Sequence, residues 1–376
     1  MAEAAPAKPK KKADYRPAGV FFFPATTLYA ALVIPWTLHG WLHGVPLPPG
    51  LRFTMGHAHE MLFGFALAVM GGFLITRVER PALAVLAASW LASRAAWLLW
   101  PGSWLSALAD VAFAGLFLHR ALPQFLVSVK KWRNHATSVG LTGLALALTL
   151  FQAALLLRHE GWLPPIRTAT VLLLVLMMSF MGGRMIAPAV AGHMQGKGFK
   201  LETRVQPYVE GALIILLPLA VFMQGAGWNR LTALALLAAS LLVLVRWLRW
   251  RWWHCLDRFD LLALAVGYLW LSIGLALLAL EALSSETVRP VALHGITIGA
   301  LGSLTATVMI RTRLMRCKIP PSQGRLVLPM TLVISLAAVL RMTPLPHDAG
   351  LIASAWLWSL VFATAFVYLI RIGKAA

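Results

Sequence analysis

Long apolar segments recur along almost the whole chain, separated by short polar connections. A transmembrane helix needs about 20 mostly apolar residues, and twelve windows of the sequence meet this requirement. They cover residues 20–40, 55–76, 81–100, 104–122, 136–157, 167–190, 207–225, 231–247, 259–281, 288–310, 325–342 and 349–370. The pattern predicts an all-α, polytopic integral membrane protein with about 12 transmembrane helices. We expect one transmembrane domain over residues 20–371.

Composition excludes the soluble classes of protein. Of the 376 residues, 60% are hydrophobic and only 12% are charged, so a soluble fold could not cover its own surface with polar groups. The chain carries 33 Lys and Arg residues against 13 Asp and Glu, for a net charge of +20. In a soluble protein this excess would suggest a nucleic-acid partner. Here the lipid bilayer is the expected partner, and no nucleic acid is expected.

The basic residues predict how the chain is oriented in the membrane. Most of them fall in every second connection between apolar segments, in phase with twelve spans. Connections rich in Lys and Arg stay in the cytoplasm, which predicts a multi-pass protein with both termini in the cytoplasm. Residues 1–19 begin with a basic stretch, and we expect them to form a disordered cytoplasmic tail.

Arg94 and Asp110 are charged residues inside predicted spans. They lie on consecutive helices joined by a tight turn at Pro101 and Gly102, at similar depths of roughly 9 Å below the outer surface. Charges in the membrane usually face the protein interior and pair with one another. We therefore expect an Arg94–Asp110 ion pair, acting either as a structural clasp or as a partner for a propionate or a proton.

Five of the eleven histidines gather at the ends of spans that we expect to face the outside. His39 and His43 end the first span, His57 and His59 begin the second, and His294 lies near the start of the tenth. Imidazole is a good ligand for iron, copper and zinc. The spacing leaves two interpretations open: a metal or haem site between spans 2 and 10, or a polar network between helices.

Helical geometry separates the two histidines of the second span. On a regular helix His57 shares a face with Glu60, Met61 and Gly64, whereas His59 points roughly 200° away from His57. One helix cannot easily direct both imidazoles at one ion. Two sites, or one ligand with a second histidine as a supporting donor, are geometrically easier.

Several stretches resemble the NnrS family. The family signature is similar to residues 57–66 (HAHEMLFGFA) and 72–76 (GFLIT). Its Gly-Gly-Arg element is similar to residues 182–188 (GGRMIAP). Its His-x-x-Thr-x-Gly-Ala element, with the Arg that follows, is similar to residues 294–303 (HGITIGALGS) and 309–314 (MIRTRL). The likeness extends over most of the chain. The sequence departs from the family pattern after the second span, at residues 77–81, and after the tenth, at residues 315–318.

The resemblance implies a bacterial inner-membrane protein that contains haem and copper and takes part in nitric oxide metabolism or in protection from nitrosative stress. Nitric oxide or a related small molecule would be the substrate or ligand, and a membrane redox partner is possible. Haem-dependent redox activity would follow, although binding alone could also protect the cell. The first candidates for metal ligands are His57, His59 and His294. Three further residues, His39, His43 and Glu60, would tune the site or hold copper. The candidate cofactor-binding arginines are Arg94 and Arg184.

Two other functions fit the same sequence features. A metal or small-solute transporter, or a copper-delivery protein, would use the His and Met residues as a path for the metal. A structural membrane subunit would use the histidines only for contacts between helices.

Overall fold

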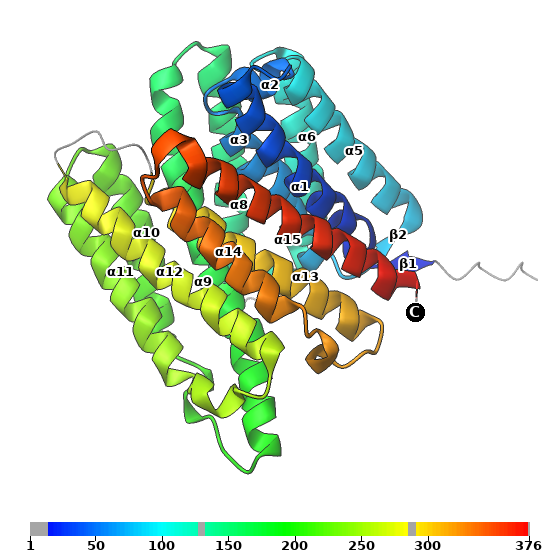
Figure 1. Cartoon of the computed structure of the whole chain (residues 1–376), viewed down its shortest axis with the longest axis vertical. Helices are drawn as coiled ribbons and strands as arrows, with labels where there is room; N and C mark the ends of the chain where they lie inside the picture. The colour runs from blue at the N-terminus through cyan, green and yellow to red at the C-terminus, as the bar shows by residue number, and fades with distance from the viewer. Residues whose placement is uncertain (1–13, 127–131, 285–290, 375–376) are drawn as a thin grey trace, which may run out of the picture.

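The computed structural model describes residues 14–126, 132–284 and 291–374. Almost all of this chain is helical (Figure 1). The α-helices are α1 (Gly19–His43), α2 (Pro49–Arg52), α3 (Gly56–His59), α4 (Leu67–Leu74), α5 (Arg80–Leu99), α6 (Trp104–Ala121), α7 (Pro123–Leu126), α8 (Trp132–Leu156), α9 (Leu163–Gly196), α10 (Pro207–Gly225), α11 (Asn229–Arg249), α12 (Phe259–Leu283), α13 (Ser303–Arg316), α14 (Val327–Met342) and α15 (Ala349–Lys374).

Two π-helices and several short elements complete the fold. The π-helices are η1 (Glu60–Ala66) and η5 (Gly295–Gly302). The single-turn 3₁₀-helices are η2 (Glu160–Trp162), η3 (Glu202–Arg204), η4 (Trp252–Cys255), η6 (Pro321–Gln323) and η7 (Pro346–Asp348). Two strands, β1 (Tyr15–Arg16) and β2 (Val78–Glu79), pair antiparallel.

Each predicted apolar segment coincides with a helix or with a continuous run of helical elements. Among the described residues, nine helical segments are long and apolar enough to cross a membrane. The other three predicted segments correspond to α6, to η5 with α13, and to α14, which has only 16 residues. The all-α class is confirmed and the helices are those of a membrane protein, while the count of twelve spans and the orientation stay predictions.

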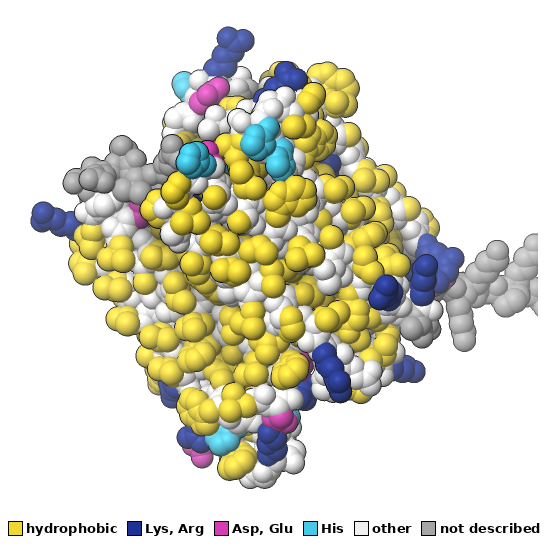
Figure 2. All heavy atoms as spheres, viewed as in Figure 1, with side chains coloured by type: hydrophobic (Ala, Val, Ile, Leu, Met, Phe, Trp, Pro, Cys, Tyr) yellow, Lys and Arg dark blue, Asp and Glu magenta, His cyan; other side chains and the backbone are white. Residues whose placement is uncertain are grey.

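The surface of the bundle has an apolar middle and charged ends. Figure 2 shows apolar side chains over the middle of the molecule, with most Lys, Arg and His side chains toward its ends. We call the end where α1 and α14 finish and α3 begins the histidine end. We call the opposite end, where α11 and α13 finish and α12 begins, the basic end. One continuous apolar core joins side chains from α1 through α15.

The first and last long helices pack side by side in the centre of the bundle (Figure 1). Pro35 lies inside α1, and because proline has no backbone N–H it leaves the carbonyl of Ala31 without its usual donor. The hydroxyl of Ser359 on α15 donates to that carbonyl at 2.6 Å, and the indole of Trp358 donates to the carbonyl of Ala30 at 3.0 Å. A neighbouring helix thus satisfies the backbone group that the proline frees.

The ordered chain begins before residue 20, the expected boundary of the tail. Tyr15 pairs with Glu79 and Arg16 with Val78, while the Arg80 guanidinium contacts the Asp14 carboxylate at 2.6 Å. The segment is ordered because backbone pairing and this ion pair hold it against the connection that follows α4. Residues 14–16 thus contact the connection after α4, whereas residues 1–13 lie outside the described part of the chain, and the boundary of the tail at residue 19 stays a prediction.

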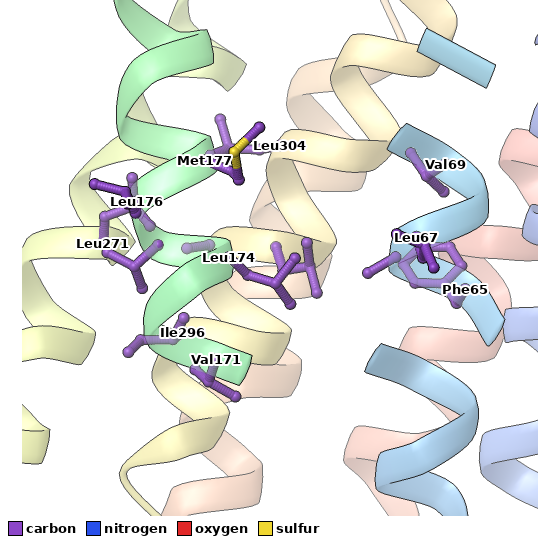
Figure 3. Close-up of a cluster of buried hydrophobic side chains, with 14 of the residues drawn as sticks. Phe65, Leu67, Val69, Val171, Leu174, Leu176, Met177, Leu271, Ile296 and Leu304 are labelled. Atoms are coloured by element: carbon purple, nitrogen blue, oxygen red, sulfur yellow. The ribbon is translucent and has the colours of Figure 1, made fainter. Parts of the chain in front are cut away.

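Small residues allow the tenth span to pack closely, as its glycine pattern suggests. A Cβ atom built on Gly299 would lie 2.5 Å from Cδ2 of Trp270, and one on Gly302 would lie 2.8 Å from Cζ3 of Trp358. Gly295 approaches Gly274 of α12 backbone to backbone. Figure 3 shows the apolar side chains of α9, α12, η5 and α13 that meet in this region.

Two arginines assigned to cytoplasmic connections by their position in the sequence are buried in the bundle. Arg246 is 1% exposed and contacts the Glu210 carboxylate at 2.5 Å. Arg311 is 6% exposed and pairs with Asp260. Each arginine lies within reach of a carboxylate on a neighbouring helix, and the ion pair offsets part of the cost of removing both charges from water.

The close crossing of α12 and η5 can be tested by adding a methyl group. We expect Gly274→Ala to lower the free energy of unfolding by about 1–3 kcal/mol, because the new Cβ would lie 2.4 Å from Cγ1 of Ile296 and 2.9 Å from its backbone nitrogen. Denaturant titration of the purified protein in detergent measures the effect.

The matched control is Gly115→Ala on α6, where no atom lies within 4 Å of the built Cβ. This variant is expected to be neutral or slightly stabilising, since alanine favours a helix more than glycine does. Equal stability of the two variants would contradict the close crossing.

Candidate functional site

A buried cluster of charged side chains lies near the histidine end, centred on Arg94 of α5. Its Nη1 contacts Oε1 of Glu60 at 2.5 Å, and its Nη2 contacts Oδ1 of Asp110 at 2.6 Å. All three side chains are almost fully buried. The ion pair expected between Arg94 and Asp110 is confirmed, and Glu60 from the start of η1 joins it.

His59 completes this cluster with both of its ring nitrogens. Nδ1 lies 2.9 Å from Oε1 of Glu60, and Nε2 lies 2.9 Å from Oδ2 of Asp110. The ring stacks on Trp97, with centroids 3.5 Å apart and planes 14° from parallel. Both nitrogens and one face of the imidazole are therefore occupied by protein groups, so this arrangement leaves neither nitrogen available to a metal ion.

Charge balance limits the number of protons in the cluster. Two carboxylates, Glu60 and Asp110, face one guanidinium, Arg94, so one further proton makes the cluster neutral. The imidazolium form of His59 donates to both carboxylates; alternatively, the proton resides on a carboxyl group. Buried charges are tolerated when they are paired and hydrogen-bonded, and this cluster meets both conditions.

Three polar residues that the sequence analysis did not single out support the carboxylates. The hydroxyl of Tyr29 donates to Glu60, the hydroxyl of Ser93 donates to Asp110, and the amide of Gln152 also donates to Asp110. The sequence could have indicated Gln152, because it is a polar residue among apolar residues in the second half of a predicted span. The contacts join α1, η1, α5, α6 and α8 at one point.

Gly64 provides the space for Arg94. A Cβ atom on Gly64 would lie 2.7 Å from Nη1 of Arg94, and the indole of Trp90 donates to the Gly64 carbonyl at 2.8 Å. Both contacts fall within the π-helix η1, where the hydrogen bonds run from residue i to i+5 instead of i+4. The π-helix therefore lies where Arg94 approaches the backbone of this span.

His57 belongs to a different environment from His59, as the helical geometry predicts. Its ring packs edge-on against Trp41, with centroids 5.3 Å apart. Its nearest charged groups are Arg341 and Arg167. Its Nδ1 is buried and has no hydrogen-bond partner among the described residues, so this imidazole has a nitrogen to offer.

His294 lies directly before η5 and is partly buried. The next residue, Gly295, packs beside the thioether of Met342, which follows Arg341 at the end of α14. Thus His57 and His294 both lie near the end of α14, each close to the beginning of a π-helix. Such helices are frequent at functional sites.

The other predicted site residues do not join these two histidines. His39 and His43 form a pair on α1 with ring centroids 5.2 Å apart, and His39 packs against Trp356 of α15. No group of three or more His, Cys, Asp or Glu side chains with metal-binding geometry occurs among the described residues. The described residues therefore give this pair no third His, Cys, Asp or Glu ligand.

Arg184, the other arginine named as a cofactor-binding candidate, lies within α9, which continues to Gly196. The side chain is exposed and lies over the ring of Phe125, 5.5 Å from its centroid. Arg184 follows Arg167 by 17 residues on one helix, which places them roughly 25 Å apart along the axis. It therefore lies toward the basic end, far from the histidines that it was expected to accompany.

Comparison with known proteins identifies the family. The family model described as NnrS protein matches residues 18–374, nearly the entire chain. This chain belongs to the NnrS family. No curated protein matches the chain, and no solved structure does.

Two stretches that resemble NnrS motifs have clear structural reasons for their glycines. Gly182 packs against the ring of Tyr268, and a Cβ atom on Gly183 would lie 2.0 Å from Nη2 of Arg246. The Gly-Gly pair of this NnrS chain thus gives space to the buried Arg246–Glu210 ion pair, just as Gly64 gives space to Arg94.

Removing Arg94 tests the buried cluster. We expect Arg94→Met to lower the free energy of unfolding by about 3–5 kcal/mol, because it leaves two buried carboxylates without their cation. Arg80→Met is the control, since Arg80 pairs with Asp14 at the surface and an exposed ion pair contributes at most about 1 kcal/mol. Denaturant titration in detergent measures both, and similar losses would contradict the role assigned to Arg94.

Proposed function

We propose that this protein is a haem-binding membrane protein of nitric oxide metabolism or of protection from nitrosative stress, with copper as a second metal. Its haem site lies at the histidine end, between the spans that contain the two π-helices. The proposal rests on family membership and on one structural observation, the environment of His57.

The residues around His57 fit a haem. A ligand to haem iron needs a nitrogen lone pair that no other group occupies, and the buried Nδ1 of His57 has no hydrogen-bond partner among the described residues. Haem also carries two propionates, and Arg167 and Arg341 are the charged neighbours of His57. His57 would thus hold the iron, while the two arginines would bind the propionates.

His294 is the proposed second ligand, because it occupies the matching position in the other π-helical span. When bound, haem supplies an iron that binds nitric oxide and can change its oxidation state. The protein contributes the imidazoles, the guanidinium counter-charges and an apolar surround. Arg94 already contacts two carboxylates. We therefore assign the binding of the haem propionates to Arg167 and Arg341 instead of Arg94.

For copper, the described residues offer the pair His39 and His43. Two imidazoles one helical turn apart can bind one ion, and their ring centroids are 5.2 Å apart. Further ligands would have to come from solvent or from another molecule. His59 and Glu60 do not qualify in this arrangement, since they contact each other and the buried ion pair.

The optical spectrum of the purified protein tests the haem site. We expect an intense haem (Soret) band that His57→Ala abolishes and His294→Ala shifts or weakens, because each variant would remove an imidazole proposed to hold the iron. The control is His159→Ala, since His159 stacks on Trp162 at the surface, and its spectrum should equal that of the unmodified protein. A full, unshifted band in both test variants would exclude these ligands.

We further propose that the protein resides in the bacterial inner membrane with its basic end in the cytoplasm. Cys317 directly follows α13 at the basic end and is partly buried, whereas Cys255 in η4 is fully buried. Burial raises the pKa of the Cys255 thiol to about 11. At neutral pH Cys255 therefore stays protonated and unreactive, because the thiolate is the nucleophile.

A membrane-impermeant maleimide can read this orientation. We expect it to label Cys317 in inside-out vesicles and not in intact spheroplasts, with little labelling of Cys255 near neutral pH and more as the pH rises toward 11. Single-cysteine variants, Cys255→Ser and Cys317→Ser, separate the two signals. Labelling of Cys317 from the outside of spheroplasts would contradict the orientation.

A further inference from the structure

Two adjacent cavities lie away from the histidines, toward the basic end. The first, of about 100 Å³, lies between α4, α9 and α13, and its walls are apolar. The second, of about 440 Å³, opens where α4 and α13 end. Phe73, Leu74 and Met185 line both cavities, so the two are adjacent and share these side chains as a common wall, with an apolar part on one side and a polar part on the other.

The polar part contains a buried hydroxyl without a partner. Thr312 is 5% exposed, and its Oγ1 has no hydrogen bond among the described residues. A buried polar group without a partner costs free energy, so a ligand that bonds to this hydroxyl would stabilise the protein. Thr312 lines the same cavity as Arg316.

Arg316 gives this cavity a positive charge. Its guanidinium reaches the carbonyls of Gly72 and Phe73 only at 3.4 and 3.5 Å, and it lies over the ring of Phe23. No carboxylate pairs with Arg316 in the part of the chain that the structure describes. Arg311 and Arg246, by contrast, each have an acidic partner, so Arg316 is left with donors for an anion.

The apolar part is lined by flexible thioethers. Five methionines contribute to it: Met70, Met177, Met178, Met181 and Met185. Figure 3 shows Met177 and Leu174 of α9 and Leu304 of α13 on one side, with Val69 of α4 across from them. Methionine side chains adapt to ligands of irregular shape, so this lining suits a flexible hydrocarbon chain.

We propose that the two adjacent cavities together bind one anionic membrane lipid, whose acyl chain passes between the side chains that the cavities share. The phosphate of the lipid contacts Arg316 and Thr312 at the polar opening, and one acyl chain enters the methionine-lined part. The guanidinium favours an anionic over a zwitterionic headgroup, because the ammonium group of a zwitterionic headgroup offsets the charge of its phosphate and repels the arginine. The apolar part favours a lipid over a free phosphate. This site is independent of the proposed haem site.

Native mass spectrometry of the full-length protein tests the site. Delipidated protein is titrated with phosphatidylglycerol and, separately, with phosphatidylcholine. We expect one tightly bound phosphatidylglycerol and no tightly bound phosphatidylcholine. Arg316→Gln and Thr312→Val should weaken the binding of phosphatidylglycerol, the arginine change by about tenfold. Arg325→Gln removes an exposed arginine at the same end and should leave the affinity unchanged.

The apolar part is tested with a second pair of variants. Met181→Phe fills the cavity and should block binding, whereas Met181→Leu keeps an apolar side chain of similar volume and should bind normally. Dodecyl phosphate should compete with phosphatidylglycerol, while inorganic phosphate should not. The melting temperature of each variant shows that it is folded.

Several results would overturn the proposal. Equal affinities of the Arg316→Gln and Arg325→Gln proteins would exclude the arginine contact, and competition by inorganic phosphate would exclude the acyl chain. Loss of binding in Met181→Leu would indicate a ligand that needs the thioether, such as Cu(I). Loss of the haem band in Met181→Phe without loss of lipid would indicate haem in this cavity.

Discussion

The cost of burying Arg94 in the membrane is the constraint on which the first half of the bundle depends. A guanidinium without a partner in a low-dielectric interior is very unfavourable, so Glu60 and Asp110 must approach it from two other helices. The oxygens of these two carboxylates also contact His59, Tyr29, Ser93 and Gln152. Since His59 is fixed inward, the helix turns His57, two residues earlier, toward Trp41 and the other half of the bundle.

Most buried charges in this NnrS protein are neutralised in pairs, and each proposed ligand site contains a buried polar atom that has no hydrogen-bond partner among the described residues. Arg246 pairs with Glu210, and Arg311 pairs with Asp260. By contrast, the buried Nδ1 of His57 and the hydroxyl of Thr312 have no hydrogen-bond partner among the described residues. One lies at the histidine end and the other at the basic end, so the two proposed sites are separated by most of the length of the bundle.

The sequence alone predicts the helices and one ion pair, but not the local distortions or the distant partners. Apolar windows locate every long helix because burial in lipid depends on composition and length. The Arg94–Asp110 pair was predictable because the two helices are consecutive. The partners of His59, and the burial of Arg246 and Arg311, depend on contacts between segments far apart in the chain. The π-helices arise where close packing inserts an extra residue into a turn, which periodicity does not reveal.

The contact between α1 and α15 has a consequence for how the chain assembles during synthesis. α1 is made before the other described helices, yet α15, which covers it and bonds to its proline-freed carbonyl, is made after them. Until then α1 must remain in lipid, or beside the insertion machinery, with one face unpacked. A chain truncated before α15 would therefore present an incompletely packed helix to membrane proteases.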